Sequence, residues 1–285
     1  MIGWVNKMIK SSKAVFGGIF ILICVTFTVA IYFNYRLEHI ALWSIKIFII
    51  VTLLYNIQFP SNLFTGLKLS RAKAYDFIMG AIITTMVFLL SMYLMSLIHV
   101  LRFINDFPQI GIRAIAQACL VGFFEELIFR AYILESLGKR FNSQDLSIHI
   151  SNLIYVIMHS FYYMKIPKIY YADLFNLPWI INMFEHIKLL DGFLMGFIGL
   201  YLFGLILSYA YVRTKAIYLG LGVHVIAVLY LKSSSSWVSY TSIKENFPIV
   251  FGYKYIYQGL LGWGILLLLF ISIYFYTKLK PNKPS

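Results

Sequence analysis

The residues best suited to chemistry lie in one apolar stretch, residues 122–131, which reads Gly-Phe-Phe-Glu-Glu-Leu-Ile-Phe-Arg-Ala. Two adjacent carboxylates, Glu125 and Glu126, and one guanidinium, Arg130, lie within an otherwise apolar segment at about 112–134. An ionised side chain at the centre of a bilayer costs about 2.5 to 3.5 kcal/mol on insertion scales. Charges in such a segment are therefore usually paired, and they are candidate functional groups.

Helical spacing gives the two carboxylates different roles. Glu126 precedes Arg130 by four residues, the spacing and order at which an acid and a base meet best on one helix face. Glu125 lies about 100° around the helix from Glu126, near the same face but away from Arg130. We therefore expect Glu126 and Arg130 to form a supporting pair and Glu125 to be left for chemistry.

Two histidines fall inside other apolar segments, His159 in segment 146–164 and His224 in segment 216–231. A single membrane histidine is usually a packing residue, but two of them with a Glu pair and an Arg indicate a converging polar site. A desolvated carboxylate is a stronger base, so Glu125 could take a proton from water. His159 would orient that water or share the proton, and His224 could donate a hydrogen bond to an oxyanion.

Other ways of cleaving peptides leave different patterns. The chain has no His-Glu-x-x-His zinc helix, no Gly-x-Ser-x-Gly nucleophile turn and no pair of intramembrane aspartates. One glutamate and two histidines could still hold a metal with an open coordination position. Zinc at Glu125, His159 and His224 is therefore the metal alternative, and otherwise we expect no cofactor.

The composition indicates an integral membrane protein. Of the 285 residues, 61% are hydrophobic and 12% charged, whereas about a quarter of residues are charged in soluble proteins. Mean hydropathy is +0.80. Apolar runs long enough to span a bilayer occur at 14–34, 40–58, 75–101, 112–134, 146–164, 192–212, 216–231 and 258–277. The sequence therefore predicts an all-α, polytopic bundle of about eight transmembrane helices.

The formal charge of +13 is interpreted as a topology signal and not as a nucleic-acid surface. Basic residues are dense at the N-terminus, in alternate short loops and in the tail. They are Lys7, Lys10, Lys13, Lys68, Arg71, Lys73, Lys139, Arg140, Arg213, Lys215, Lys278, Lys280 and Lys283. The longer opposite loops carry fewer per residue, so the positive-inside rule predicts that both termini are cytoplasmic.

No internal repeat or linker divides the chain, so residues 1–285 are interpreted as a single integral membrane domain. The loop 165–191 has the pattern of a helix lying in the membrane interface. Glycines in segment 192–212, together with Gly220 and Gly222, are expected to let helices approach closely.

These motifs resemble the CAAX protease and bacteriocin-processing (CPBP, or Abi) family of glutamic-type intramembrane endopeptidases. Its Glu-Glu-x-x-x-Arg motif is met by Glu125, Glu126 and Arg130. Its Phe-x-x-x-His motif is met by Tyr155 and His159, with Tyr in place of Phe. Its His-x-x-x-Asn motif is met by His224, but Val228 stands at the usual Asn position. The resemblance covers about residues 112–231, the family-like catalytic core.

The resemblance implies that Glu125 and His159 activate the water, that Glu126 and Arg130 support them, and that His224 helps to bind the oxyanion. Val228 supplies no polar atom for that last role. Asn152, seven residues before His159 on the same helix face, is the candidate for the missing group.

The leading hypothesis is an endopeptidase of the cell membrane that cleaves a membrane protein or a lipidated peptide. The runner-up is a catalytically inactive family member that acts as a membrane binding, immunity or scaffold protein, with Val228 as its best support. A transporter with a proton relay is the third reading, but the chain shows no inverted repeat. Richness in Ile, Lys, Tyr and Asn indicates a bacterial source, hence a multi-pass protein of the cytoplasmic membrane.

Overall fold

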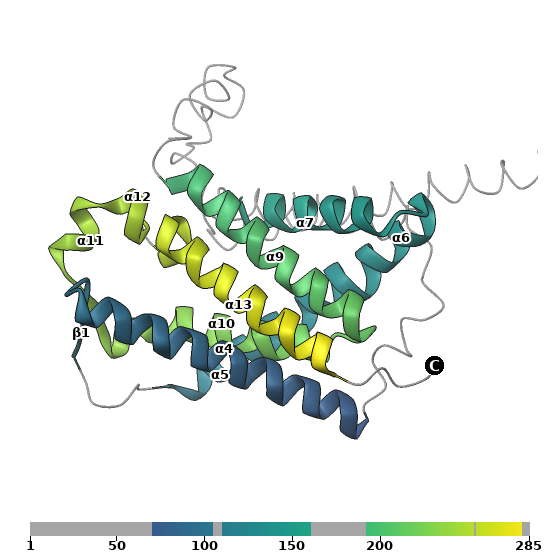
Figure 1. Cartoon of the computed structure of the whole chain (residues 1–285), viewed down its shortest axis with the longest axis horizontal. Coiled ribbons are helices and arrows are strands. Elements are labelled where there is room, and N and C mark those ends of the chain that lie inside the picture. The colour runs from purple at the N-terminus through teal and green to yellow at the C-terminus, as the bar shows by residue number, and fades with distance from the viewer. Residues whose placement is uncertain (1–69, 105–109, 161–191, 254, 281–285) are drawn as a thin grey trace, which may run out of the picture. The chain divides into compact units, whose positions relative to one another are not determined.

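The computed structural model describes residues 70–104, 110–160, 192–253 and 255–280, which all belong to one compact unit of the chain. Helices dominate this part, as predicted (Figure 1). The elements are α4 (Arg71–Leu97), β1 (Leu101–Phe103), α5 (Ile112–Glu125), η1 (Glu126–Leu134), α6 (Glu135–Phe141), α7 (Gln144–Ser160), α9 (Leu194–Thr214), α10 (Tyr218–Ser233), η4 (Ser234–Ser236), β2 (Val238–Tyr240), α11 (Ser242–Asn246), α12 (Pro248–Phe251), η5 (Ile256–Gln258) and α13 (Leu260–Leu279).

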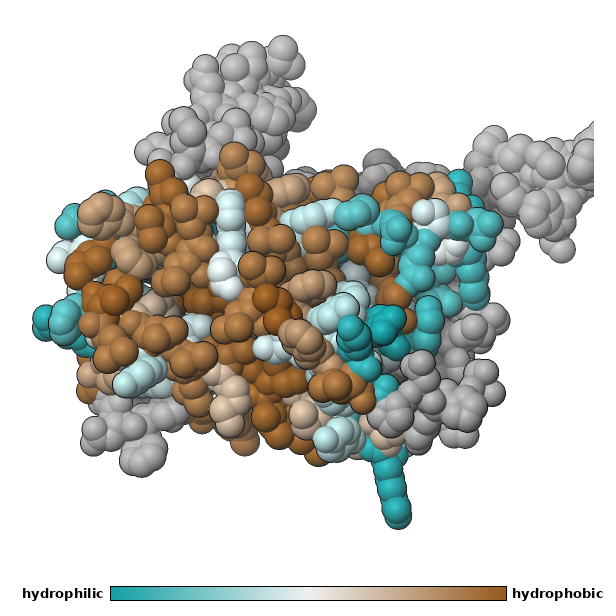
Figure 2. All heavy atoms as spheres, in the orientation of Figure 1, coloured by the Kyte–Doolittle hydropathy of each residue, from teal (hydrophilic) through white to brown (hydrophobic). Residues whose placement is uncertain are grey.

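Four helices of the described part are long and apolar enough to cross a membrane: α4, α9, α10 continued through η4, and α13. They coincide with the predicted spans 75–101, 192–212, 216–231 and 258–277. Segment 112–134 is helical as α5 and η1, and α7 covers most of segment 146–164. Hydrophobic side chains cover the middle of the visible surface, and hydrophilic ones gather toward its two ends (Figure 2).

The spans 14–34 and 40–58 and the interfacial helix in the loop 165–191 fall outside the described residues. An all-α membrane protein is therefore confirmed, whereas the number of eight spans and the single domain stay predictions.

Helix α10 packs against α4, α5 and α9. Small residues permit the closest of these approaches. A Cβ at Gly222 of α10 would collide with the backbone carbonyl of Phe77 in α4, and one at Gly80 of α4 with the carbonyl of Leu219 in α10. The expected role of Gly222 in helix packing is thereby confirmed, because only glycine lets two helix backbones come this near.

Contacts at the helix ends define how the helices run relative to one another. The segments that follow α4 and α10 are joined by the antiparallel pairing of β1 with β2. The start of α4 is joined to the end of α13, where Lys280 Nζ lies 2.7 Å from Asp76 Oδ2 and Tyr276 donates to Asp76 Oδ1 at 2.7 Å. Both pairings are consistent with the predicted alternation of sides.

The placement of the two termini stays a prediction that reporter fusions can test. Because basic residues are retained on the cytoplasmic side, fusions after Lys13, within residues 71–73 and after Lys283 are expected to read cytoplasmic. A fusion within residues 170–175 is expected to read the opposite. Reporters at Lys13 and Lys283 that read opposite sides would show an odd number of crossings and overturn this topology.

Candidate active site

The site is built where the segment 112–141 changes its helical form. Glu125 is the last residue of α5, and Glu126 is the first residue of η1, a π-helix that runs to Leu134. In a π-helix the backbone bonds span five residues instead of four, and such turns are frequent at functional sites. The Glu125 side chain remains 22% exposed, whereas that of Glu126 is 1% exposed. The adjacent carboxylates therefore have different surroundings.

Glu125 meets both predicted histidines. Its Oε2 lies 3.2 Å from His159 Nε2 on α7 and 3.6 Å from His224 Nε2 on α10. His159 is partly exposed, like Glu125, whereas His224 is buried. Three elements distant in the sequence thus bring one carboxylate oxygen and two imidazole nitrogens together, the convergence that the sequence predicts.

Glu126 has a contact that the sequence does not reveal. Its Oε1 lies 3.1 Å from His224 Nδ1, so the second carboxylate holds the second histidine. Its Oε2 lies against α10 at Gly220, where a Cβ would come within 2.7 Å of that oxygen. Gly220 belongs to the first turn of α10, and the positive end of a helix dipole favours a carboxylate there.

The two histidines are held at their Nδ1 atoms. His159 Nδ1 lies 2.8 Å from the carbonyl oxygen of Tyr155, which can only accept a hydrogen bond, so this nitrogen carries a proton. His224 Nδ1 likewise faces a carboxylate oxygen of Glu126. Both Nε2 atoms are then turned toward Glu125. Glu125 Oε2 is therefore the atom at which the two imidazoles meet.

Arg130 lies deep inside the described helices, with no exposed surface. Its Nε is 4.0 Å from Glu126 Oε1, the outer limit of an ion pair. Its guanidinium also lies 5.1 Å from the ring centroid of Tyr155. Arg130 therefore lies near Glu126, as predicted, and also near the ring of Tyr155. The sequence pattern indicates Tyr155 as a motif residue but not as a contact of Arg130.

Asn152 is fully buried, but its contact is with α9. Its Oδ1 accepts a hydrogen bond from Ser208 at 3.1 Å and lies 2.8 Å from the position that a Cβ at Gly204 would take. Its Nδ2 has no hydrogen-bond partner in the described part of the chain. Asn152 thus lies on the helix that carries His159, but in the described part of the chain its side chain bonds to α9 and to no residue of the Glu125 cluster. Val228 is half-buried on α10.

Within the described ranges, no group of three His, Cys, Asp or Glu side chains is arranged to hold a metal ion. In the observed arrangement both histidines point at the same carboxylate oxygen instead of surrounding a common centre. Zinc therefore stays an alternative for experiment, and the chemistry below is derived from the side chains themselves.

The fold and the site together define a class: a helical membrane protein with a Glu, His, His cluster between its helices. Residues 107–230 match the family model described as Type II CAAX prenyl endopeptidase Rce1-like. This segment contains the whole cluster, so the resemblance to the CAAX protease family that the motifs indicate is confirmed. No curated protein and no solved structure matches the chain significantly.

The space at Gly220 gives a sharp test of the Glu126 contact. A Gly220→Ala substitution is expected to displace the Glu126 carboxylate, because the new Cβ would meet Glu126 Oε2 and no other atom closer than 3.5 Å. Activity should fall by about tenfold or more, since misplacement by 1 Å can cost about 10²-fold. In a Glu126→Ala background the same change should have no further effect, because nothing remains to be displaced.

Gly138→Ala is the matched control, because a Cβ there meets no atom within 4 Å. Equal losses for Gly220→Ala with and without Glu126 would show that the glycine acts through helix packing instead.

Proposed function

We propose that the protein is an endopeptidase that hydrolyses a peptide bond of a membrane-associated or lipid-modified protein or peptide within the bilayer. The observation that carries this proposal is the convergence of His159 Nε2 and His224 Nε2 on Glu125 Oε2, at 3.2 and 3.6 Å. The family match supports the same reaction class. A carboxylate beside two anchored imidazoles can accept, share and return a proton, which peptide hydrolysis requires.

Glu125 acts as the general base in this mechanism. It removes a proton from a water molecule while the water oxygen attacks the carbonyl carbon of the scissile bond. The proton is held between Glu125 and His159, whose Nε2 is the nearer of the two imidazole nitrogens. Collapse of the tetrahedral intermediate breaks the C–N bond, and the same proton passes to the leaving amine. Water is thus divided between the two products.

His224 stabilises the oxyanion of the intermediate. Because its Nδ1 faces Glu126, it can donate from Nε2 only as an imidazolium. The buried carboxylate of Glu126 supports that positive charge. Val228 cannot form a hydrogen bond to the oxyanion, so the charged imidazole of His224 forms it. Hydrogen bonds from charged groups are roughly twice as strong as those between neutral groups.

A His224→Ala substitution tests the oxyanion role. Turnover is expected to fall by about 10²- to 10³-fold, the loss that accompanies removal of one oxyanion donor. His149→Ala is the matched control, because His149 lies on α7 and contacts Tyr201 on α9 instead of Glu125. Unchanged turnover in a folded His224→Ala protein would remove His224 from the mechanism.

The substrate class is tested by comparing membrane-associated peptides from cells with the native protein and with Glu125→Ala. Peptides that accumulate uncleaved in the variant are the substrates, and purified protein in vesicles should cleave them. A synthetic CAAX peptide, with and without its prenyl group, tests whether a lipid is required. Identical peptide sets, with no cleavage by the purified protein, would favour the binding or scaffold protein.

Chelation separates the water mechanism from zinc. We expect activity to survive extended dialysis against a chelator, because the proton transfers use only the Glu and His side chains. Loss of activity that is restored by added Zn²⁺ would establish the metal alternative at Glu125, His159 and His224.

A further inference from the structure

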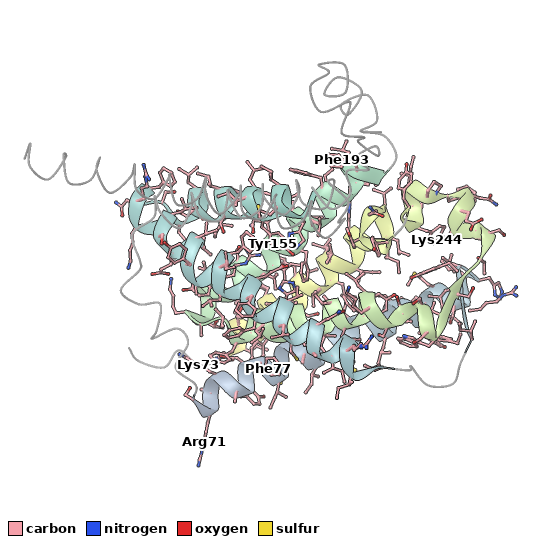
Figure 3. All side chains as sticks on the ribbon, turned by 180° about the vertical axis from the view of Figure 1, so that it is seen from behind. Arg71, Lys73, Phe77, Tyr155, Phe193 and Lys244 are labelled. Atoms are coloured by element: carbon pink, nitrogen blue, oxygen red, sulfur yellow. The ribbon has the colours of Figure 1, made fainter. Side chains whose placement is uncertain are left out.

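Tyr155 occupies a central position that the proposed mechanism does not use. It lies on α7 one helical turn before His159 and is 2% exposed (Figure 3). Its carbonyl oxygen accepts the His159 Nδ1 proton. Its ring centroid is 4.2 Å from that of His159, with the planes inclined by 42°, and 5.1 Å from the Arg130 guanidinium carbon. One aromatic ring therefore touches both a catalytic imidazole and the buried cation.

His159 is held at Nδ1 by the Tyr155 carbonyl, but it is less enclosed than His224. Its side chain is 28% exposed, whereas that of His224 is 3% exposed and is held by Glu126 and by the ring of Phe203 at 5.4 Å. One hydrogen bond at Nδ1 fixes that nitrogen but still allows the imidazole plane to tilt about it. The ring of Tyr155 limits that rotation on one side and so keeps Nε2 aimed at Glu125.

Arg130 depends on the same ring. In the described part its three guanidinium nitrogens form no hydrogen bond, and Glu126 lies at the limit of ion pairing. A guanidinium within about 6 Å of an aromatic centroid is attracted to the ring face. Phe129 of η1 adds an edge contact to the ring at 5.1 Å. Tyr155 is therefore fixed from the side of η1 and touches His159 on its own helix.

We infer that Tyr155 is a positioning residue of the active site, which transmits the placement of Arg130 to His159 through its aromatic ring. The expected effect on turnover rests on the proposed function. The expected effect on the orientation of His159 does not. Because the aromatic ring makes these contacts, phenylalanine at position 155 should preserve the orientation of His159, whereas an aliphatic residue should not.

Two measurements on Tyr155→Leu and Tyr155→Phe test the inference. Tyr155→Leu should lower kcat by about 10²-fold with little change in KM, because a misaimed base slows the chemical step and leaves binding intact. Tyr155→Phe should retain most of the turnover. Tyr209→Leu is the matched control, since its ring packs on Phe270 and Tyr274 between α9 and α13.

The second measurement is independent of proteolysis. Diethylpyrocarbonate modifies accessible imidazole nitrogens, and mass spectrometry locates the modified residue. We expect His159 to react several-fold faster in Tyr155→Leu than in the native protein, and at the native rate in Tyr155→Phe and Tyr209→Leu. If the native protein cleaves no peptide, the proposed function fails while this measurement still decides the role of Tyr155.

Native His159 reactivity in folded Tyr155→Leu, or equal damage from Tyr155→Phe, would overturn the inference. Should Tyr155→Leu not be recovered from membranes, Tyr155→Met fills a similar volume with a flexible chain and is judged by the same two readouts.

Discussion

Replacing Glu125 by Gln is expected to lower peptide hydrolysis by about 10²- to 10⁴-fold, the contribution typical of a general base. The amide has almost the same shape as the carboxylate but cannot take a proton from water. Substrate binding should persist, because the change removes no volume and the carboxylate is partly exposed. The measurement is single-turnover cleavage of an identified substrate in vesicles, beside binding of the same peptide.

Glu135→Gln is the control for this substitution. Glu135 lies on the same continuous helical segment, nine residues beyond Glu126, and accepts a hydrogen bond from Tyr211 at 3.4 Å. It should retain activity. A folded Glu125→Gln protein with native turnover would remove the general base from the mechanism and leave a binding protein as the better explanation.

Arg130→Ala is expected to destabilise the folded protein by about 3 to 5 kcal/mol, the usual cost of removing one partner from a buried ion pair. The buried carboxylate of Glu126 would lose its nearest guanidinium, and Tyr155 would lose the cation on its ring. Yield in the membrane and the midpoint of thermal unfolding in detergent measure the effect. Activity should fall together with the yield.

Arg130→Lys separates the charge from the shape of the side chain. Lysine keeps a positive charge near Glu126 but has no planar group to lie on Tyr155, so an intermediate stability is expected. Full yield and native activity in Arg130→Ala would contradict the supporting role of this pair.

The sequence was sufficient to predict which side chains converge, because charges and histidines in apolar segments require partners. It could not predict every pairing. The sequence predicts His224 as an oxyanion donor or a zinc ligand, but it gives no sign that His224 Nδ1 meets Glu126, 98 residues away in the chain. Spacing along one helix carries no information about which atom of a neighbouring helix lies opposite. Gly220, one turn before His224, is visible in the sequence, but it does not by itself indicate the contact with Glu126, since glycines also serve helix packing.

The change from α- to π-helix after Glu125 also escaped prediction. The i,i+4 rule assumes α-helical turns, and by that rule Glu126 and Arg130 should meet closely. In η1 the distance from Arg130 Nε to Glu126 Oε1 is 4.0 Å, and the Arg130 guanidinium also lies near the ring of Tyr155. No residue type in Glu-Leu-Ile-Phe-Arg-Ala-Tyr-Ile-Leu is specific to a π-helix. Within η1 the carbonyl of Phe129 accepts a hydrogen bond from Ser151 of α7, a contact between helices that spacing along one helix does not reveal.

The contact between Asp76 and Lys280 has a consequence for biogenesis. Asp76 enters the membrane with α4, near the beginning of that helix, but its cation follows 204 residues later in the chain. During synthesis this carboxylate is without Lys280 until the end of α13 has left the ribosome. Helix α13 therefore supplies a contact that α4 lacks when it is inserted, and a chain that stops before Lys280 leaves the Asp76 carboxylate without that cation.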